Sequence, residues 1–338
     1  MGKKTIIAET LDRFGLWSRV LDLRKHLHDP FLSILTYHRI GHPSDSPLCD
    51  ADIFDSTPER FRQELAFLKS HFQILSLAEL RSHLLQTGRL PRRAALITFD
   101  DGYKDNLTVA APLLQEFGLP ASFFIATDFI AERRMFWWDA VSFILGQCKK
   151  PIIDLAPFGP LPLQSAREQI LLQIKAAHGL NIEGLLQGLA KAAEVDFSRE
   201  IETAEADRII MTWDEIRTLS KMGMEIQSHT RGHRVLQTVP TDELDNELQG
   251  SKSILEGITG EEVFALAFPV GRTLSGFPHV RTAIQRAGYD LAFSNCSGVN
   301  RQNTFDRFEI RRMGLEFGMP HAMFRAMLAV PQLGYSDY

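Results

Sequence analysis

Two neighbouring carboxylates, Asp100 and Asp101, stand at the end of an apolar run in the segment LITFDDGYKDN (96–106). Like charges this close together raise each other's proton affinity, and an apolar setting adds a desolvation penalty. A cation, a proton or exposure to water must offset that penalty. Paired carboxylates at such a position could hold a metal ion with one group and accept a proton with the other.

A second set of potential ligands is the pair His229 and His233 in SHTRGH. Histidines at i and i+4 can converge on one metal ion if the segment turns helically. Two imidazoles and one carboxylate make a three-ligand set that leaves positions open for water or substrate. Isolated H-x-x-x-H pairs commonly bind nothing, and Asp-Asp before Gly is often only a turn. Their joint position at predicted strand ends favours metal binding over both alternatives.

The elements that must position these groups alternate between strands and helices. Helices begin at Thr57 with Pro58 and at the capping box of Thr212 and Glu215, and another ends at Gly88. Apolar and β-branched runs predict strands that include 31–41, 93–99, 224–229, 263–271, 290–295 and 307–315. This alternation indicates an α/β fold with a mostly parallel sheet, open or closed into a barrel, whose ligand site lies at the carboxyl ends of the strands.

The alternation stops at about residue 131 and resumes at about residue 210. We expect 131–210 to be a helical insertion or lid without strands. Its Pro-rich stretch 151–162 is predicted to be a loop, and Ser165 with Glu168 is predicted to form a capping box before the next helix.

Residues 1–30 are predicted to form an N-terminal helical extension. Ile7, Leu11, Phe14 and Leu21 follow roughly helical spacing, although Gly15 interrupts it. We expect a helix packed on the domain. The alternative is a helix lying on a membrane surface, a peripheral contact through residues 1–30. Acidic residues within the segment dilute its basic charge and count against that alternative.

Composition excludes several classes of protein. The chain has 338 residues, 44% hydrophobic and 23% charged, which is typical of a globular protein. Its net charge of −5 and the lack of a long basic run argue against nucleic-acid binding. No stretch reaches about 18 uncharged apolar residues, so no transmembrane helix is expected. Three cysteines without a C-x-x-C pair favour a reducing compartment, and we expect a cytoplasmic protein, alternatively one peripheral to the inner membrane face.

The motifs TFDDGYKDN, SHTRGH and AFPVG occur in the order and spacing of the polysaccharide deacetylase family, the NodB-homology carbohydrate esterases. ILTYHRI and FWWD resemble one subgroup of it. The resemblance covers roughly 31–315 apart from the insertion, and we assign 31–338 to the deacetylase domain. It implies a distorted (β/α) barrel with fewer than eight strands and a divalent metal, zinc or another first-row ion. The implied reaction removes N-acetyl groups from amino sugars of a polysaccharide or its lipid-linked precursor, in exopolysaccharide biosynthesis.

The resemblance also implies roles for individual residues. By position, Asp101, His229 and His233 would be the metal ligands, and Asp100 the general base for a water held by the metal. The third motif contains Val270, whose backbone N–H would stabilise the oxyanion of the tetrahedral intermediate.

The chain departs from the family pattern in two places. No Arg precedes AFPVG, and Val270 replaces an aromatic residue, so Arg312 or Arg311 on the last predicted strand is expected to orient Asp100. The late Leu-x-x-His motif that supplies the general acid has no equivalent. His38, at the end of the first predicted strand, is the candidate acid, and a hydrogen-bonded core histidine is the alternative.

Further alternatives concern the insertion and the function. Trp137 and Trp138 are expected in the core of the insertion, with sugar stacking by one of them as the alternative, and Asp139 would bond a sugar hydroxyl or cap a helix. Other functions are deformylation or deacylation of a lipid-linked amino sugar, non-catalytic carbohydrate binding with degenerate late motifs, and a two-His-one-carboxylate oxygenase. The intact Asp100 argues against a pure binder, which needs no base beside the metal.

Overall fold

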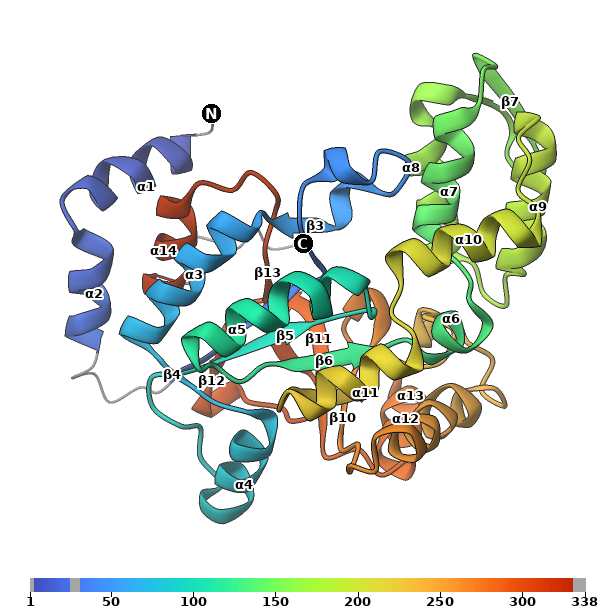
Figure 1. The fold of residues 1–338 in the computed structure, drawn as a ribbon. Coiled ribbons are helices and arrows are strands. Elements are labelled where there is room, and N and C mark those ends of the chain that lie inside the picture. Colours follow the sequence, from blue (N-terminus) through green and yellow to red (C-terminus); the bar gives the residue numbers. More distant parts are fainter. Residues whose placement is uncertain (1–2, 25–30, 331–338) are drawn as a thin grey trace.

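A closed ring of seven parallel strands forms the centre of the computed structural model, which describes residues 3–24 and 31–330 (Figure 1). The strands pair in the order β1–β13–β11–β10–β9–β6–β5, and β5 pairs again with β1. They are β1 (Phe31–Tyr37), β5 (Ala94–Phe99), β6 (Ser122–Ile125), β9 (Glu225–Ser228), β10 (Ala265–Ala267), β11 (Leu291–Ser297) and β13 (Ile310–Gly314). This ring confirms the predicted distorted barrel with fewer than eight strands.

Short strands extend the ring. β12 (Asn300–Arg301) pairs antiparallel with β1, β4 (Gln73–Ile74) pairs with β5, and β2 (Arg39–Ile40) pairs with β3 (Phe54–Ser56) outside the ring. The strand pairing of the ring is shortest between β9 and β10, which are in register only at Ser228 opposite Leu266. The barrel is therefore distorted at this point.

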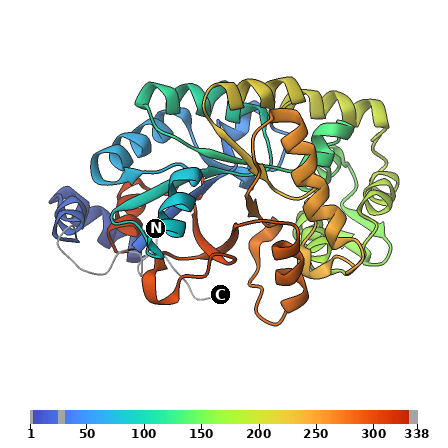
Figure 2. The same ribbon diagram turned by 90° about the horizontal axis from the view of Figure 1, so that it is seen from below.

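Helices surround the strands when the molecule is seen from below (Figure 2). The side chain of Thr57 accepts a hydrogen bond from the backbone N–H of Arg60, Gly88 ends its helix at φ 62°, and both bonds of the Thr212–Glu215 capping box are present, as predicted. Outside the insertion and the N-terminal segment, the α-helices are α3 (Pro58–His71), α4 (Leu77–Thr87), α5 (Ala111–Phe117), α6 (Thr127–Glu132), α11 (Trp213–Lys221), α12 (Ser251–Thr259), α13 (Pro278–Arg286) and α14 (His321–Ala329).

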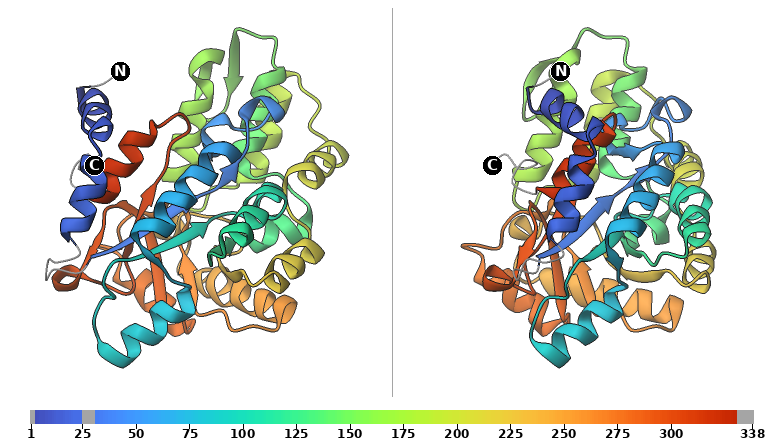
Figure 3. Two further views of the ribbon diagram at one scale, coloured as in Figure 1. Left: turned by 60° about the vertical axis from the view of Figure 1, so that its left-hand side comes forward. Right: turned by 90° about the vertical axis from the view of Figure 1, so that its left-hand side faces the viewer.

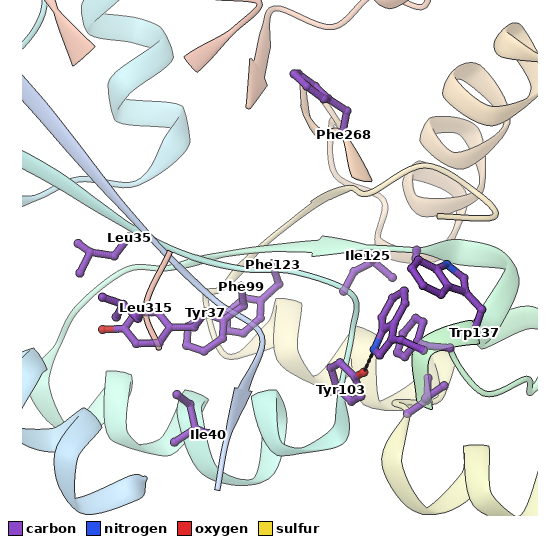
Figure 4. Close-up of a cluster of buried hydrophobic side chains, with 14 of the residues drawn as sticks. Leu35, Tyr37, Ile40, Phe99, Tyr103, Phe123, Ile125, Trp137, Phe268 and Leu315 are labelled. Atoms are coloured by element: carbon purple, nitrogen blue, oxygen red, sulfur yellow. Dashed lines mark hydrogen bonds between the residues drawn. The ribbon is translucent and has the colours of Figure 1, made fainter. Parts of the chain in front are cut away.

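The alternation of side chains along the strands separates two cores. Tyr37, Phe99 and Phe123 point to the helices and form a stacked row, with ring centroids 5.3 Å and 4.7 Å apart (Figure 4). Because successive side chains of a strand point to opposite faces, the residues after Tyr37 and Phe99 point to the barrel interior. Those residues are His38 and Asp100, and the register pairs Tyr37 with Phe99, so the two groups emerge side by side.

The segment between α6 and α11 contains four helices and a hairpin: α7 (Trp137–Gln147), α8 (Leu163–Ala176), α9 (Ile182–Ala193), α10 (Arg199–Ile209), and β7 (Ile152–Leu155) paired with β8 (Gly159–Pro162). The expectation of a segment without strands, with a loop at 151–162, was therefore wrong. Ile153, Leu155 and Leu161 are buried on one face of the hairpin, and Pro160 and Pro162 lie on the solvent side, where a proline without an N–H is tolerated. In the sequence these prolines indicated a loop, although the apolar residues of the hairpin alternate with exposed ones.

The predicted capping box at Ser165 and Glu168 was also wrong. α8 begins two residues before Ser165, with Pro162 at the N-cap position, so Ser165 lies inside the first turn. Its hydroxyl donates to the carbonyl of Pro162 instead of accepting a backbone N–H.

The N-terminal helices α1 (Lys3–Arg13) and α2 (Leu16–Arg24) form an outer layer against α14, which lies between them and the barrel (Figures 1 and 3). The buried side chains of this layer are Ala8, Trp17 and Leu21. Ile7 and Phe14 are 56% and 72% exposed, so the expected packing on the domain is wrong for these two residues. The chain turns at Gly15, with φ 65°, between the two helices, and both helices contact α14. Among the described residues, no helix has the length and apolarity to cross a bilayer.

Candidate active site

The candidate residues meet at the carboxyl ends of the barrel strands, as expected for parallel architectures. A cavity of about 410 Å³ opens there between the barrel and α8. Its lining includes His38 after β1, Asp100 and Asp101 after β5, His229 and His233 after β9, Val270 after β10, and Asn295 on β11.

Three of these side chains have the spacing of a metal site. Nε2 of His229 lies 3.4 Å from Oδ1 of Asp101, and Nε2 of His233 lies 3.3 Å from the same oxygen. One ligand atom from each residue lies within 4.8 Å of the others. Ligands at zinc distances of about 2.0–2.2 Å in a tetrahedron are about 3.3–3.6 Å apart, so both separations match a tetrahedral edge.

The hydrogen bonds of these three residues also fit a cation. Asp101 is 1% exposed, and neither of its carboxylate oxygens receives a hydrogen bond from the described residues. Burial alone would raise the pKa of Asp101, but the imidazoles of His229 and His233 lower it, so the group is ionised. Nδ1–H of His229 donates to the carbonyl of Ala267 at 2.6 Å, which leaves the lone pair of Nε2 directed toward Asp101. A buried anion with two unused acceptors and a neighbouring free imidazole nitrogen suits a divalent metal.

The backbone around the site is strained. Asp101, Thr230, His233 and Val270 have φ values of 76°, 64°, 49° and 60°, in the left-handed region that L-residues rarely adopt. Each such conformation costs about 1–3 kcal/mol and persists only where the surroundings determine it. Asp101, His233 and Val270 line the cavity and Thr230 directly follows His229, as expected for a functional site.

Asp100 is held by the buried guanidinium of Arg312. The pair is bidentate, with Nη1 and Nη2 of Arg312 donating to the two carboxylate oxygens at 2.8 Å and 2.7 Å. Nε of Arg312 donates to the carbonyl of Ser294, and the guanidinium lies 5.7 Å above the ring of Phe124 in the barrel interior. Burial would raise the pKa of Asp100, but the charge of Arg312 outweighs it and the pKa is lowered.

The sequence left Arg311 and Arg312 open as partners of Asp100. β13 alternates, so Arg311 is exposed and its guanidinium contacts the carbonyl of Ser297, whereas Arg312 is fully buried. The structure therefore brings Arg312 to Asp100.

His38, whose side chain is 23% exposed, pairs with the buried Asp55, a residue that the sequence analysis missed. The backbone N–H and Nδ1 of His38 contact Oδ2 of Asp55 at 2.5 Å and 3.2 Å. Burial would lower the pKa of His38, but the Asp55 carboxylate reverses this and raises it to about 9. The imidazole is thus charged near neutrality in the same cavity as Asp100 and Asp101. The alternative of a core histidine bonded only to backbone does not fit this contact.

The AFPVG turn approaches β11 very closely. A Cβ on Gly271, which has φ 62°, would lie 2.0 Å from the backbone nitrogen of Asn295. The side chain of Asn295 accepts a hydrogen bond from Arg312 at 2.8 Å and lines the cavity. Gly271 therefore fixes the position of Val270 relative to the Asp100–Arg312 pair.

The tryptophans join the insertion to the site. Trp137 and Trp138 are almost fully buried, and the ring of Trp138 lies 4.5 Å from the ring of His233. Nε1–H of Trp138 donates to the hydroxyl of Tyr103, which in turn donates to Asp139. Asp139 also accepts the backbone N–H of Asp50 and neither contacts solvent nor caps its helix with a side-chain bond.

α8 provides the outer wall of the cavity. Arg167, Leu171, Leu172 and Lys175 line it from one face of this helix. Arg167 forms an ion pair with Asp50, which ties the wall to the segment before β3. The cavity thus combines a charged floor with a partly apolar rim.

A family model for polysaccharide deacetylases matches residues 87–292. The chain belongs to the polysaccharide deacetylase family. It is a hydrolase, and the family assignment agrees with the resemblance of its three motifs. The YHRI segment at 37–40 lies outside the matched range, whereas the WWD segment at 137–139 lies inside it. The assignment to a subgroup of the family therefore stays a prediction.

Individual proteins of the polysaccharide deacetylase family resemble the chain distantly. YxkH of Bacillus subtilis (strain 168), whose name places it in this family, is 18% identical over 298 residues, 88% of this chain and 76% of YxkH. The poly-β-1,6-N-acetyl-D-glucosamine N-deacetylase of Escherichia coli (strain K12) is 30% identical over 95 residues, 28% of this chain and 13% of that protein.

Solved structures of other proteins share the fold. Streptococcus pyogenes deacetylase PplD in complex with acetate has a TM-score of 0.57 at 18% identity, covering 88% of this chain and 99% of PplD. IcaB from Ammonifex degensii has a TM-score of 0.54 at 16% identity, covering 89% of this chain and 96% of IcaB. These likenesses support the barrel described above.

Gly271→Ala should unfold or distort the turn, because the added Cβ overlaps a backbone atom that cannot move away. We expect a loss of about 3 kcal/mol or more in the free energy of unfolding. Gly276→Ala is the matched control, since Gly276 has φ 84° with no atom within 4 Å of an added Cβ. It should lose only the cost of the left-handed backbone, about 1–2 kcal/mol. Denaturant unfolding of both variants measures the difference, and equal losses would refute the close-approach argument.

Proposed function

We propose that the protein is a metal-dependent deacetylase that removes N-acetyl groups from the amino sugars of a polysaccharide or its lipid-linked precursor. The observation that carries this proposal is the cavity in which the Asp101–His229–His233 cluster, the Asp100–Arg312 pair and the His38–Asp55 pair meet. Amide hydrolysis needs a held water, a base, an oxyanion donor and an acid, and these groups could supply each of them.

Asp101, His229 and His233 are the residues that would hold the metal, and zinc is our candidate because both ligand separations match a tetrahedral edge. A bound zinc ion would acidify water and polarise the carbonyl of the acetyl group. Another first-row divalent ion could take the same ligands.

The remaining groups would move protons and stabilise charge. Asp100, kept ionised and oriented by Arg312, would accept the proton of the attacking water. The backbone N–H of Val270 would donate to the oxyanion. The positively charged His38 would give its proton to the amine nitrogen, which leaves poorly unless it is protonated.

Two observations bear on the substrate. The matching E. coli protein is named for poly-β-1,6-N-acetyl-D-glucosamine, which supports an N-acetylglucosamine polymer as the substrate class. The apolar rim formed by Leu171 and Leu172 supports the second candidate, deformylation or deacylation of an amino sugar on a lipid carrier. The intact Asp100–Arg312 pair argues against the non-catalytic alternative, because a binding protein needs no oriented base. The cytoplasmic location stays a prediction.

Release of acetate from N-acetylated glycans and from lipid-linked N-acetyl sugars tests this proposal. We expect release that stops with a chelator and returns with zinc. Release of formate or a longer acid in place of acetate would identify the second candidate. Full activity in the metal-free protein would refute the metal assignment.

The two neighbouring aspartates should fail in different ways. Asp100→Asn should retain metal but lose turnover by about 100-fold or more, because the base is lost while the ligands remain. Asp101→Asn should lower the metal content, because it replaces a charged ligand by a neutral amide. Metal analysis and single-substrate kinetics on both variants separate the roles. Full activity in Asp100→Asn would show that another group is the base.

The His38–Asp55 pair should set the alkaline limb of the pH–rate profile. With a pKa of about 9, His38 holds its proton below that pH, so activity should fall as pH rises through about 9. Asp55→Asn removes the carboxylate that raises this pKa, and the limb should move toward about 6.5 or below. The stability of the protein should change in the same direction. The His38–Asp55 pair contributes its full stabilisation below about pH 6.5, and this stabilisation is lost as pH rises through about 9.

Profiles of kcat against pH for Asp55→Asn and His38→Ala check this assignment, with metal content as a second readout that should not change. His42→Ala is the matched control, since His42 is half-exposed on the following loop. If the alkaline limb of the pH–rate profile is unchanged in His38→Ala, His38 is not the general acid and its role is structural.

A further inference from the structure

The N-terminal helix layer carries several exposed apolar side chains. Ile6, Ile7, Phe14 and Leu23 are 52%, 56%, 72% and 69% exposed. These are four of the eight large hydrophobic side chains that are exposed in the described part of the chain, although residues 3–24 are only 22 of its residues. Exposed apolar side chains concentrated in one element mark an interaction surface, whereas scattered ones need no explanation.

The charge of the same segment is opposite to that of the whole chain. Residues 1–25 contain six Lys and Arg but three Asp and Glu, whereas the chain has a net charge of −5. Asp12, which dilutes this charge in the sequence, is turned inward and contacts Arg325 of α14 at 3.3 Å. Arg13 and Arg19 are exposed. Asp22 is exposed as well, so the positive charge of the layer is the net charge of its sequence, and its exposed apolar side chains lie in a segment of net positive charge.

We propose that α1 and α2 form a docking surface for a membrane with anionic lipid headgroups. Helices that lie in the plane of a membrane interface bury apolar side chains at the acyl boundary and place Lys and Arg among the headgroups. The helices lie outermost on the side of the barrel away from α7–α10, so nothing in the described part of the chain covers them (Figures 1 and 3).

A second copy of the chain fits this face less well. In a two-fold dimer the same patch meets itself, and two segments of net positive charge would then oppose each other. An anionic bilayer complements both the apolar and the basic side chains. The docking surface goes beyond the proposed deacetylation, and because it can be measured without substrate, its failure would leave that reaction unaffected.

Co-sedimentation of the full-length protein with lipid vesicles tests the proposal. One set of vesicles is phosphatidylcholine alone, and the other contains about a third phosphatidylglycerol. We expect binding to the anionic vesicles that weakens as salt is added. The double variant Ile7→Ser/Phe14→Ser should bind about tenfold more weakly, because two apolar side chains are lost from the interface. Arg13→Glu/Arg19→Glu should also bind at least about tenfold more weakly.

Leu85→Ser is the matched control, since Leu85 is 66% exposed on α4 and lies outside the layer. It should bind like the unchanged protein. Phe14→Ser alone, at the most exposed of these positions, guards against misfolding of the double variants, and circular dichroism checks the fold of each protein. Equal binding to both kinds of vesicle, no binding to either, equal weakening by Leu85→Ser, or a dimer that Phe14→Ser dissociates would overturn the proposal.

Discussion

Two ionised carboxylates buried side by side after β5 are the constraint around which this molecule is organised. Asp100 and Asp101 are each 1% exposed, so neither can rely on water for solvation. The two are surrounded differently: a bidentate guanidinium offsets the charge of Asp100, whereas Asp101 faces the imidazoles of His229 and His233, the first of which directs a nitrogen lone pair toward it. This division separates an oriented base from a ligand set, because only Asp101 keeps oxygens without a hydrogen-bond donor.

The division also makes the site depend on closure of the barrel. Arg312 lies on β13, 212 residues after Asp100, and reaches it only because β1 pairs with both β5 and β13. Removing one partner of a buried ion pair costs about 3–5 kcal/mol. A barrel that failed to close would therefore leave Asp100 unpaired at a similar cost. The ion pair thus couples the folding of the last strand to the formation of the base.

The sequence predicted the groups whose position follows from strand ends and missed those whose position depends on tertiary contacts. Asp100 and His229 end strands with clear apolar patterns, so their convergence could be inferred. Asp55 lies on a strand of three residues without periodicity, and nothing local indicates that it meets His38. Asn295 was missed for the same reason, since only the Gly271 approach brings it to the cavity. The hairpin within 151–162 was hidden by its prolines.

The insertion is better understood as a fixed wall than as a moving lid. Tyr103 follows Asp101 by two residues, receives the N–H of Trp138 and donates to Asp139, all inside the core. Burial raises the pKa of Asp139 to about 6. The carboxylate of Asp139 accepts hydrogen bonds from the hydroxyl of Tyr103 and from the backbone N–H of Asp50. Opening the insertion would leave these buried polar groups without partners, at about 1–3 kcal/mol for each one. It would also remove Trp138 from His233, so the wall and the ligand set are parts of one structure.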